Sequence, residues 1–159
     1  MTTMTRDRRI GELRVESAMH AGIHTCDRDT PLTEVAATMA REHIHCLVVE
    51  GSSGESGPPW GIVSDLDLVA AAMVRDLDEQ TAGGSAATPV VMIAPHETLE
   101  RAAQLMTEHG CSHLIVVDRA QQRPVGVLST LDMAASLAPL PAGRGGTDND
   151  GEASCAYAI

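Results

Sequence analysis

Two stretches of the chain carry the same pattern of apolar and polar positions, at a constant offset of 67 residues. Apolar residues recur there at the spacing of one helix face, and the two sets are Leu32, Val35, Ala36 and Met39, and Leu99, Ala102, Ala103 and Met106. Thr30 with Pro31, and Thr98 in the second copy, stand where a helix start signal is expected. The pattern therefore predicts one amphipathic helix in each copy.

Short apolar runs rich in β-branched residues follow these helices at 46–49 and 114–117 and predict buried strands. Each copy continues through a second strand, 62–63 or 125–128, into an Ala-rich helix, 66–75 or 131–137. The segments GIHTC and PVVMI supply a further strand ahead of the first helix. The predicted fold class is α/β (α+β), with two β-α-β-β-α repeats packed about a pseudo-two-fold axis.

The ends of the repeats follow from where this pattern starts and stops. We expect a flexible tail over 1–14, a first repeat over 15–76, a linker over 77–88 and a second repeat over 89–138. The turn-forming run 51–59 predicts a mobile hairpin loop. The Pro-, Gly- and acid-rich segment 139–159 predicts a disordered tail.

Composition narrows the classes of function. The formal net charge is −11 and the chain contains no lysine, which disfavours nucleic acid and anionic membranes as partners. Four cysteines show no CxxC spacing, and neither a signal-peptide pattern nor a run of about 18 apolar residues is present. We therefore expect a soluble cytoplasmic protein with reduced thiols.

The junction between the last strand and the last helix of each repeat carries a doubled motif. GIVSDLDL supplies Gly61, Ser64 and Asp67, and GVLSTLDM supplies Gly126, Ser129 and Asp132. Within this repeat, the pattern G-x-x-[ST]-x-x-D resembles the CBS domain in its tandem pair, the Bateman module. The resemblance covers roughly residues 15–138.

The resemblance implies roles for the motif residues. Asp67 and Asp132 would hold a ribose, Ser64 and Ser129 would face ribose or phosphate, and Gly61 and Gly126 would let backbone approach the ligand. A helix N-terminus favours an anion, and a carboxylate accepts hydrogen bonds from ribose hydroxyls, so the physics agrees. The alternative is that the serines cap the following helices and the aspartates favour their first turns.

Further residues of the clefts are implied in the same way. In related adenosine-phosphate sites a His or Arg at the start of the middle strand contacts the phosphate; His45 occupies that position, and His113 lies one place beyond it. Apolar walls for a base are Ile23, Val91, Ile62 and Val127, which suit an ordinary core equally well. Without Arg or Lys at these strand starts, charge favours AMP, ADP or adenosine over ATP, with S-adenosylmethionine also open.

Two other classes of function compete with nucleotide binding. Imidazoles and thiols that could hold a metal are His43, His45, Cys46, His109, Cys111 and His113, although their spacings match no zinc finger or ribbon. A ligand-free homodimeric scaffold could assemble through the Ala-rich helices, over 69–73 and 133–137. Catalytic motifs are missing, so an enzyme is not expected.

We therefore expect a regulatory module that binds an adenine nucleotide between its repeats, forms a homodimer and signals to an effector protein whose identity the sequence does not give.

Overall fold

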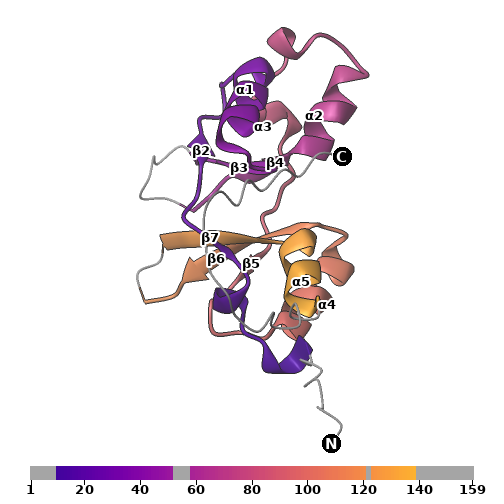
Figure 1. Cartoon of the computed structure of the whole chain (residues 1–159). Helices are drawn as coiled ribbons and strands as arrows, with labels where there is room; N and C mark the ends of the chain where they lie inside the picture. Colours follow the sequence, from indigo (N-terminus) through magenta and orange to yellow (C-terminus); the bar gives the residue numbers. More distant parts are fainter. Residues whose placement is uncertain (1–9, 52–57, 121–122, 139–159) are drawn as a thin grey trace, which may run out of the picture.

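Two halves of the protein repeat one unit in the computed structural model, which describes residues 10–51, 58–120 and 123–138 (Figure 1). The first half contains β2 (Thr25–Cys26), α1 (Leu32–Glu42), β3 (Cys46–Val49), β4 (Gly61–Ser64) and α2 (Asp65–Ala72). The second contains β5 (Met92–Ile93), α4 (Leu99–His109), β6 (His113–Asp118), β7 (Arg123–Ser129) and α5 (Thr130–Leu137). The predicted β-α-β-β-α order is confirmed in both halves.

Each half has its own sheet with the same pairing. In the first, β2 pairs with β3 in parallel and β3 with β4 antiparallel. In the second, β5 pairs with β6 in parallel and β6 with β7 antiparallel. The parallel pairs require a crossover, which α1 and α4 provide. A further strand, β1 (His20–Ala21), adds to the second sheet beside β7, although it precedes the first half in the chain.

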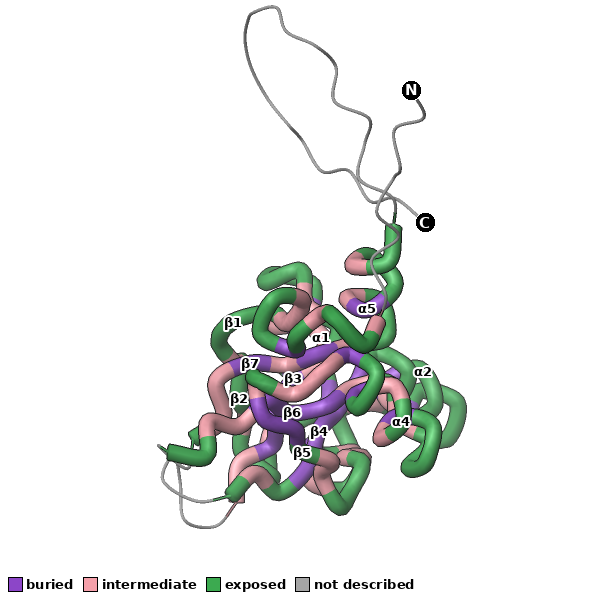
Figure 2. The backbone as a smooth tube through the Cα atoms, turned by 90° about the horizontal axis from the view of Figure 1, so that it is seen from below, coloured by how far each residue is buried: buried purple, intermediate pink, exposed green. Residues whose placement is uncertain are grey.

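The middle strands β3 and β6 contain the apolar runs 47–49 and 114–117, because both faces of these strands are covered. Leu47 and Val49 of β3 face the helices of the first half, whereas Val48 between them belongs to a different cluster. In β6, Ile115 lies in that same cluster. We call this group the seam cluster; its buried members are Val48, Ile62 and Ile115, and Ile23, Cys46, Val90, Val117 and Val127 pack against it. Figure 2 shows the buried strands at the centre and exposed helices outside.

The two amphipathic helices bury the faces that the sequence predicts. The buried residues are Leu32, Val35 and Met39 on α1, and Leu99, Ala102 and Met106 on α4. Thr98 caps α4, since its Oγ1 accepts a hydrogen bond from the Arg101 N–H at 3.1 Å. The expected capping role of Thr30 is wrong: α1 begins after Pro31 without a side-chain cap. The fixed φ of proline orders that first turn instead.

The segments that lead into the two halves each dock on the opposite half. Residues 10–21, with the 3-10 turns η1 (Ile10–Glu12) and η2 (Val15–Ser17), pack on the second half, where Val15 is fully buried against Leu99 and its neighbours. Residues 77–87, with η4 (Leu77–Glu79) and α3 (Ala82–Ser85), pack on the first half, where Ala82 is fully buried. Each core is therefore closed by the segment that precedes the other half.

The docked segments differ from the expected tail and linker. Residues 10–14 are held in place, because the Leu99 N–H donates to the Leu13 carbonyl at 2.9 Å. Residues 77–87 form part of the first core rather than a plain joint, and the Leu32 N–H donates to the Gln80 carbonyl at 3.0 Å. The two hydrogen bonds are equivalent in the repeat, because their donors lie 67 residues apart in sequence and so do their acceptors. The expected flexibility of 1–9, of the loop 52–57 and of the tail 139–159 concerns residues outside those described.

Truncating Val15 tests the docking of the leading segment. Val15→Ala should lower the free energy of unfolding by about 2 kcal/mol, because it leaves a cavity in the second core. Urea unfolding followed by circular dichroism measures this. Glu16→Ala, at the exposed neighbouring position, should change stability by less than about 0.5 kcal/mol. Equal stability of the Val15 variant and the native chain would show that the segment is not docked in solution.

Candidate functional site

The two strand-to-helix junctions have the same hydrogen-bond geometry. Ser64 ends β4 with an extended backbone, and its Oγ accepts a hydrogen bond from the Asp67 N–H at 3.3 Å. In return, Asp67 Oδ2 accepts hydrogen bonds from the Ser64 N–H and hydroxyl, each at 2.7 Å. Ser129 and Asp132 repeat this arrangement at 3.1, 2.7 and 2.7 Å. Each junction is therefore a capping box, which satisfies backbone donors that a helix start leaves free.

The capping boxes use one oxygen of each carboxylate. Asp132 Oδ2 faces its own turn, whereas Asp132 Oδ1 lies 2.9 Å from Nδ1 of His20. For Asp67 Oδ1, no hydrogen-bond partner occurs among the described residues. The capping role that the sequence left open is thus present at both junctions. It does not exclude ligand binding, because a carboxylate has a second oxygen with its own acceptor sites.

The two motif glycines leave room for other segments of the same chain that pass close to them. A Cβ at Gly61 would lie 2.8 Å from the Ala86 Cβ and 3.0 Å from the Ala87 carbonyl oxygen. A Cβ at Gly126 would collide with the His20 carbonyl oxygen. In both halves the leading segment of the other half runs across the glycine. Neighbouring segments of the same chain therefore approach both glycines closely, and the approach of a ligand, which the resemblance implies, stays a prediction.

A cleft of about 290 Å³ lies between the halves at the second junction. It brings together residues from β1 and the segment after it, from the start of β3, and from the Ser129–Asp132 turn. The lining residues are His20, Ala21, Gly22, Ile23, His24, His43, Ile44, His45, Cys46, His113, Val127, Ser129, Leu131 and Asp132. Five of the seven histidines of the chain line this one cleft, and no arginine is among its described lining residues.

Three of the five imidazoles around the cleft, those of His20, His45 and His113, have an oxygen partner at Nδ1. His45 Nδ1 lies 3.0 Å from Asp65 Oδ2, and His113 Nδ1 lies 3.0 Å from the Ser112 hydroxyl. Burial lowers the pKa of His113, and the nearby His45 lowers it further, although the carboxylates of three aspartates act in the opposite direction. We therefore expect a neutral His113 at pH 7, since burial disfavours the charged form.

Cys46 occupies the position in β3 equivalent to that of His113 in β6. Burial, together with the charges of Asp65 and Asp132, raises the pKa of the Cys46 thiol to about 12. Burial likewise raises the pKa of Cys26 to about 11 and raises that of Cys111. The raised pKa values favour protonated thiols at neutral pH, which makes them weak nucleophiles.

The cleft gathers some of the residues that the sequence singled out, but not all of them. His45, His113, Ile23, Ser129 and Asp132 line it, together with Val127. The residues outside its lining are Gly61, Ser64, Asp67, Gly126, Val91 and Ile62. Val91 packs against the core of the second half, and Val90 is the structural equivalent of Ile23 in the seam cluster.

Sequence reasoning missed His20 and His24 as cleft residues. The offset of 67 residues aligns them with Ala87 and Val91, so the repeat pattern gave no reason to select them. His20 enters the cleft because β1 pairs with β7, with His20 opposite Val127. This pairing joins residues far apart in sequence, and a two-residue strand carries no detectable periodicity.

The metal alternative gains no support from side-chain positions. Among the described residues, no three His, Cys, Asp or Glu side chains are close enough to share a metal ion. His109 and Cys111 lie outside the cleft lining.

A broader hollow of about 950 Å³ shares no residue with the cleft. It includes Asp27, Asp29, Glu50 and Arg28, and the Arg28 guanidinium stacks on Trp60. Its three carboxylates disfavour an anionic ligand.

Comparison with known proteins assigns the family. The sequence model of the CBS domain matches residues 12–74 and 84–138, so the chain belongs to the CBS-domain family. It is 27% identical over 123 residues to the CBS domain-containing protein YhcV of Bacillus subtilis (strain 168), which covers 77% of this chain and 84% of YhcV. No helix in the described ranges is long and apolar enough to cross a membrane.

Solved structures share the fold. The CBS domain protein TA0289 of Thermoplasma acidophilum superposes with a TM-score of 0.69 at 22% identity, covering 79% of this chain and 70% of that one. The CBS domain pair of MJ0100, in complex with methylthioadenosine and S-adenosyl-L-methionine, gives 0.66 at 20% identity, with coverage of 77% and 94%. Hypoxic Response Protein I, with two coordinated zinc ions, gives 0.60 at 23% identity, with coverage of 77% and 98%.

Replacing Asp132 in two ways separates the capping role of its carboxylate from any ligand role. Asp132→Ala should cost about 1 kcal/mol of unfolding free energy, because it removes the oxygen that accepts from Ser129. Asp132→Asn keeps one such oxygen and should retain most of that stability. Thermal and urea unfolding of the two variants test this. Equal stabilities would contradict a capping role in solution.

The lowered pKa of His113 predicts a loss of stability in acid. Because the folded protein favours the neutral imidazole, stability falls as the pH drops below about 6.5, the ordinary value for histidine, towards the lowered value. His113→Gln should therefore reduce the fall in melting temperature between pH 7 and pH 5. The same substitution at the exposed His109 is the control. An NMR titration that gives His113 an ordinary or raised pKa would contradict the prediction.

Proposed function

We propose that this chain is a regulatory module that binds an adenine nucleotide of the AMP or ADP kind between its two CBS repeats. The observation that carries the proposal is the composition of the cleft. Asp132 of the second half lines it together with His43 and His45 of the first. A carboxylate for ribose hydroxyls and imidazoles for phosphate thus face one cavity from the two sides of the seam.

The size and charge of the cleft favour a small nucleotide. Ligand pockets commonly measure about 300–1,000 Å³, so a cleft of about 290 Å³ suits a nucleoside or its monophosphate better than a triphosphate. Imidazoles are the polar donors here, and no cationic arginine joins them in the described lining. This supports AMP or ADP over ATP, which usually needs clustered cations.

The mirrored junction supports a second site in the first half. Asp67 makes the same capping box as Asp132, and its Oδ1 has no partner within the described part of the chain. We therefore assign Asp67, Ser64 and Gly61 to this second junction. Ile62 and Val90 of the seam cluster are its candidate apolar walls. The adenosine-type ligands bound to the MJ0100 pair support the same ligand class, and S-adenosylmethionine stays an alternative.

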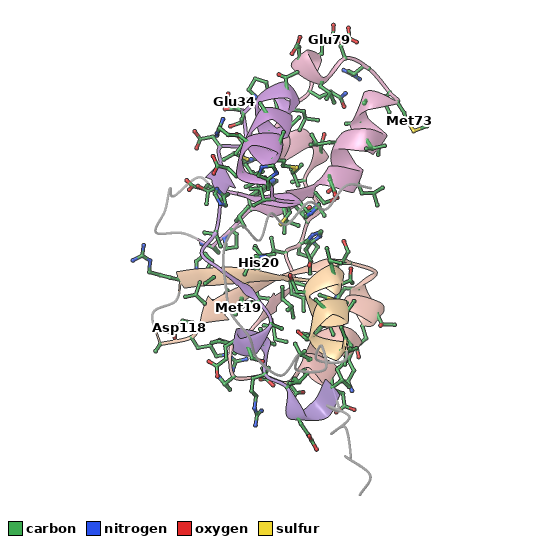
Figure 3. The ribbon with its side chains drawn as sticks, in the orientation of Figure 1. Met19, His20, Glu34, Met73, Glu79 and Asp118 are labelled. Carbon is green, nitrogen blue, oxygen red and sulfur yellow. The ribbon has the colours of Figure 1, made fainter. Side chains whose placement is uncertain are left out.

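We propose that the module forms a homodimer and signals to an effector protein. Six large apolar side chains on or beside α2 and α5 are 48–85% exposed: Leu66, Val69, Met73, Val74, Leu131 and Leu137. Figure 3 shows Met73 at an outer end of the first half. Exposed apolar side chains gathered on helices are typical of association faces. Met133, which the sequence also assigned to this face, is buried instead.

A cytoplasmic, non-catalytic protein that contacts neither nucleic acid nor membrane completes the proposal. The net charge of −11 supports the absence of nucleic-acid and membrane contacts. Experiment has to distinguish this function from two alternatives. One is a ligand-free association scaffold, and the other is a metal-binding module, as the zinc ions of Hypoxic Response Protein I suggest.

Nucleotide titration tests the proposal directly. AMP, ADP, ATP and S-adenosylmethionine are titrated into the purified protein by calorimetry, and the melting temperature is followed in parallel. A ligand present at 100 times its Kd should stabilise the fold by about 2.7 kcal/mol. Asp132→Asn and Asp67→Asn keep a capping oxygen, but an amide nitrogen replaces the second carboxylate oxygen, which is the proposed acceptor for ribose. Each should weaken binding at its own junction about 10-fold or more.

The outcomes separate the three functions. A dimer that binds no adenosine compound at millimolar concentration would support the scaffold and reject the sensor. Stabilisation by zinc alone, lost on removal of His43 and His45, would support the metal alternative. Nucleotide binding that survives both Asp→Asn changes together would reject the ribose assignment.

A further inference from the structure

The two junctions differ in what contacts the second oxygen of the motif carboxylate. Asp132 Oδ1 pairs with His20 Nδ1 at 2.9 Å, so that both oxygens of this carboxylate are engaged. The residue equivalent to His20 in the repeat is Ala87, which has no side-chain donor. Within the described residues Asp67 therefore keeps a free Oδ1, while Asp132 does not.

The backbone fixes His20 in place, but its side chain is free to turn. His20 pairs with Val127 across β1 and β7, and the Gly22 N–H donates to the Val125 carbonyl at 2.8 Å. The imidazole itself is 81% exposed, whereas the Asp132 side chain is 9% exposed. Figure 3 shows His20 on the segment between the two halves. The ring can therefore leave Asp132 by rotation about its own bonds, without repacking the core.

We propose that His20 is an intramolecular competitor for Asp132, and that it makes the two nucleotide sites unequal. This inference rests on the proposed function. A ribose that approaches Asp132 needs the oxygen that His20 occupies, so the imidazole has to swing out before the ligand can bind. The same movement enlarges the cleft, since His20 is part of its lining. The Asp67 junction binds without such a displacement.

The size of the effect follows from the kind of contact displaced. A His–carboxylate pair with one exposed partner contributes little, and its loss corresponds to a factor of about 2 to 5 in affinity. His20→Ala should therefore tighten binding at Asp132 by that factor. It should leave the Asp67 site unchanged, because the contact involves Asp132 alone.

The test measures AMP affinity with one junction disabled at a time. In an Asp67→Asn background, which reports the Asp132 site, His20→Ala should lower the Kd for AMP about 2- to 5-fold. In an Asp132→Asn background the same change should have no effect. Ala87→His, which places an imidazole at the equivalent exposed position, should weaken AMP binding at Asp67. His109→Ala, outside the cleft lining, is the control for loss of a histidine.

A second readout does not depend on added nucleotide. The ring nitrogen NMR signals of His20 in the free protein should shift in Asp132→Asn and stay unchanged in Asp67→Asn. Identical His20 signals in both variants would show that His20 does not contact Asp132 in solution.

The failures of the two proposals are distinguishable. If native protein and the His20→Ala variant bind AMP with equal affinity at Asp132, or if the variant binds more weakly, the competitor is rejected while the nucleotide site stands. If AMP binds the His20→Ala variant but not native protein, the competition is stronger than expected and the inference holds. If neither binds AMP, both proposals fail.

Discussion

The face-to-face packing of the two sheets is the contact on which the rest of the molecule depends. Val48, Ile62 and Ile115 form its buried centre, and each is an alternate residue of a strand whose other face packs on helices. This packing brings the start of β3 to the end of β7. Without it, His45 and Asp132 would belong to separate surfaces, and the cleft would not exist.

Sequence periodicity predicted the elements with long, regular patterns and failed for the short ones. The eleven-residue helices α1 and α4 each carry four apolar positions on one face, three of which are buried, so the type of element and its buried face could be predicted. The three-residue turns η1 and η2 carry no period, and their burial depends on a partner about 80 residues away. Local sequence contains no record of such contacts.

The sequence could predict which residues stand at the candidate site, but not which atoms of those residues make contacts. The doubled motif located both strand-to-helix junctions, and His45, which the resemblance singled out, lines the same cleft as Asp132. The sequence could not decide between capping and ligand binding for Asp132, because the two oxygens of its carboxylate have different contacts. Oδ2 caps the helix, and Oδ1 lies against His20. The role of His20 depends on strand pairing between distant segments, which residue types do not reveal.

The exchange of leading segments means that the sequence repeat is not an independent folding unit. The Val15 N–H donates to the Glu97 carbonyl at 2.9 Å, and the Ala82 N–H donates to the Thr30 carbonyl at 2.8 Å, so each half is completed by chain from beyond its own boundary. A single copy could close its core only by taking this segment from a second molecule, as a swapped dimer does. Joining two copies in one chain makes the exchange intramolecular, so that its strength depends on effective concentration within the chain and not on how much protein the cell contains.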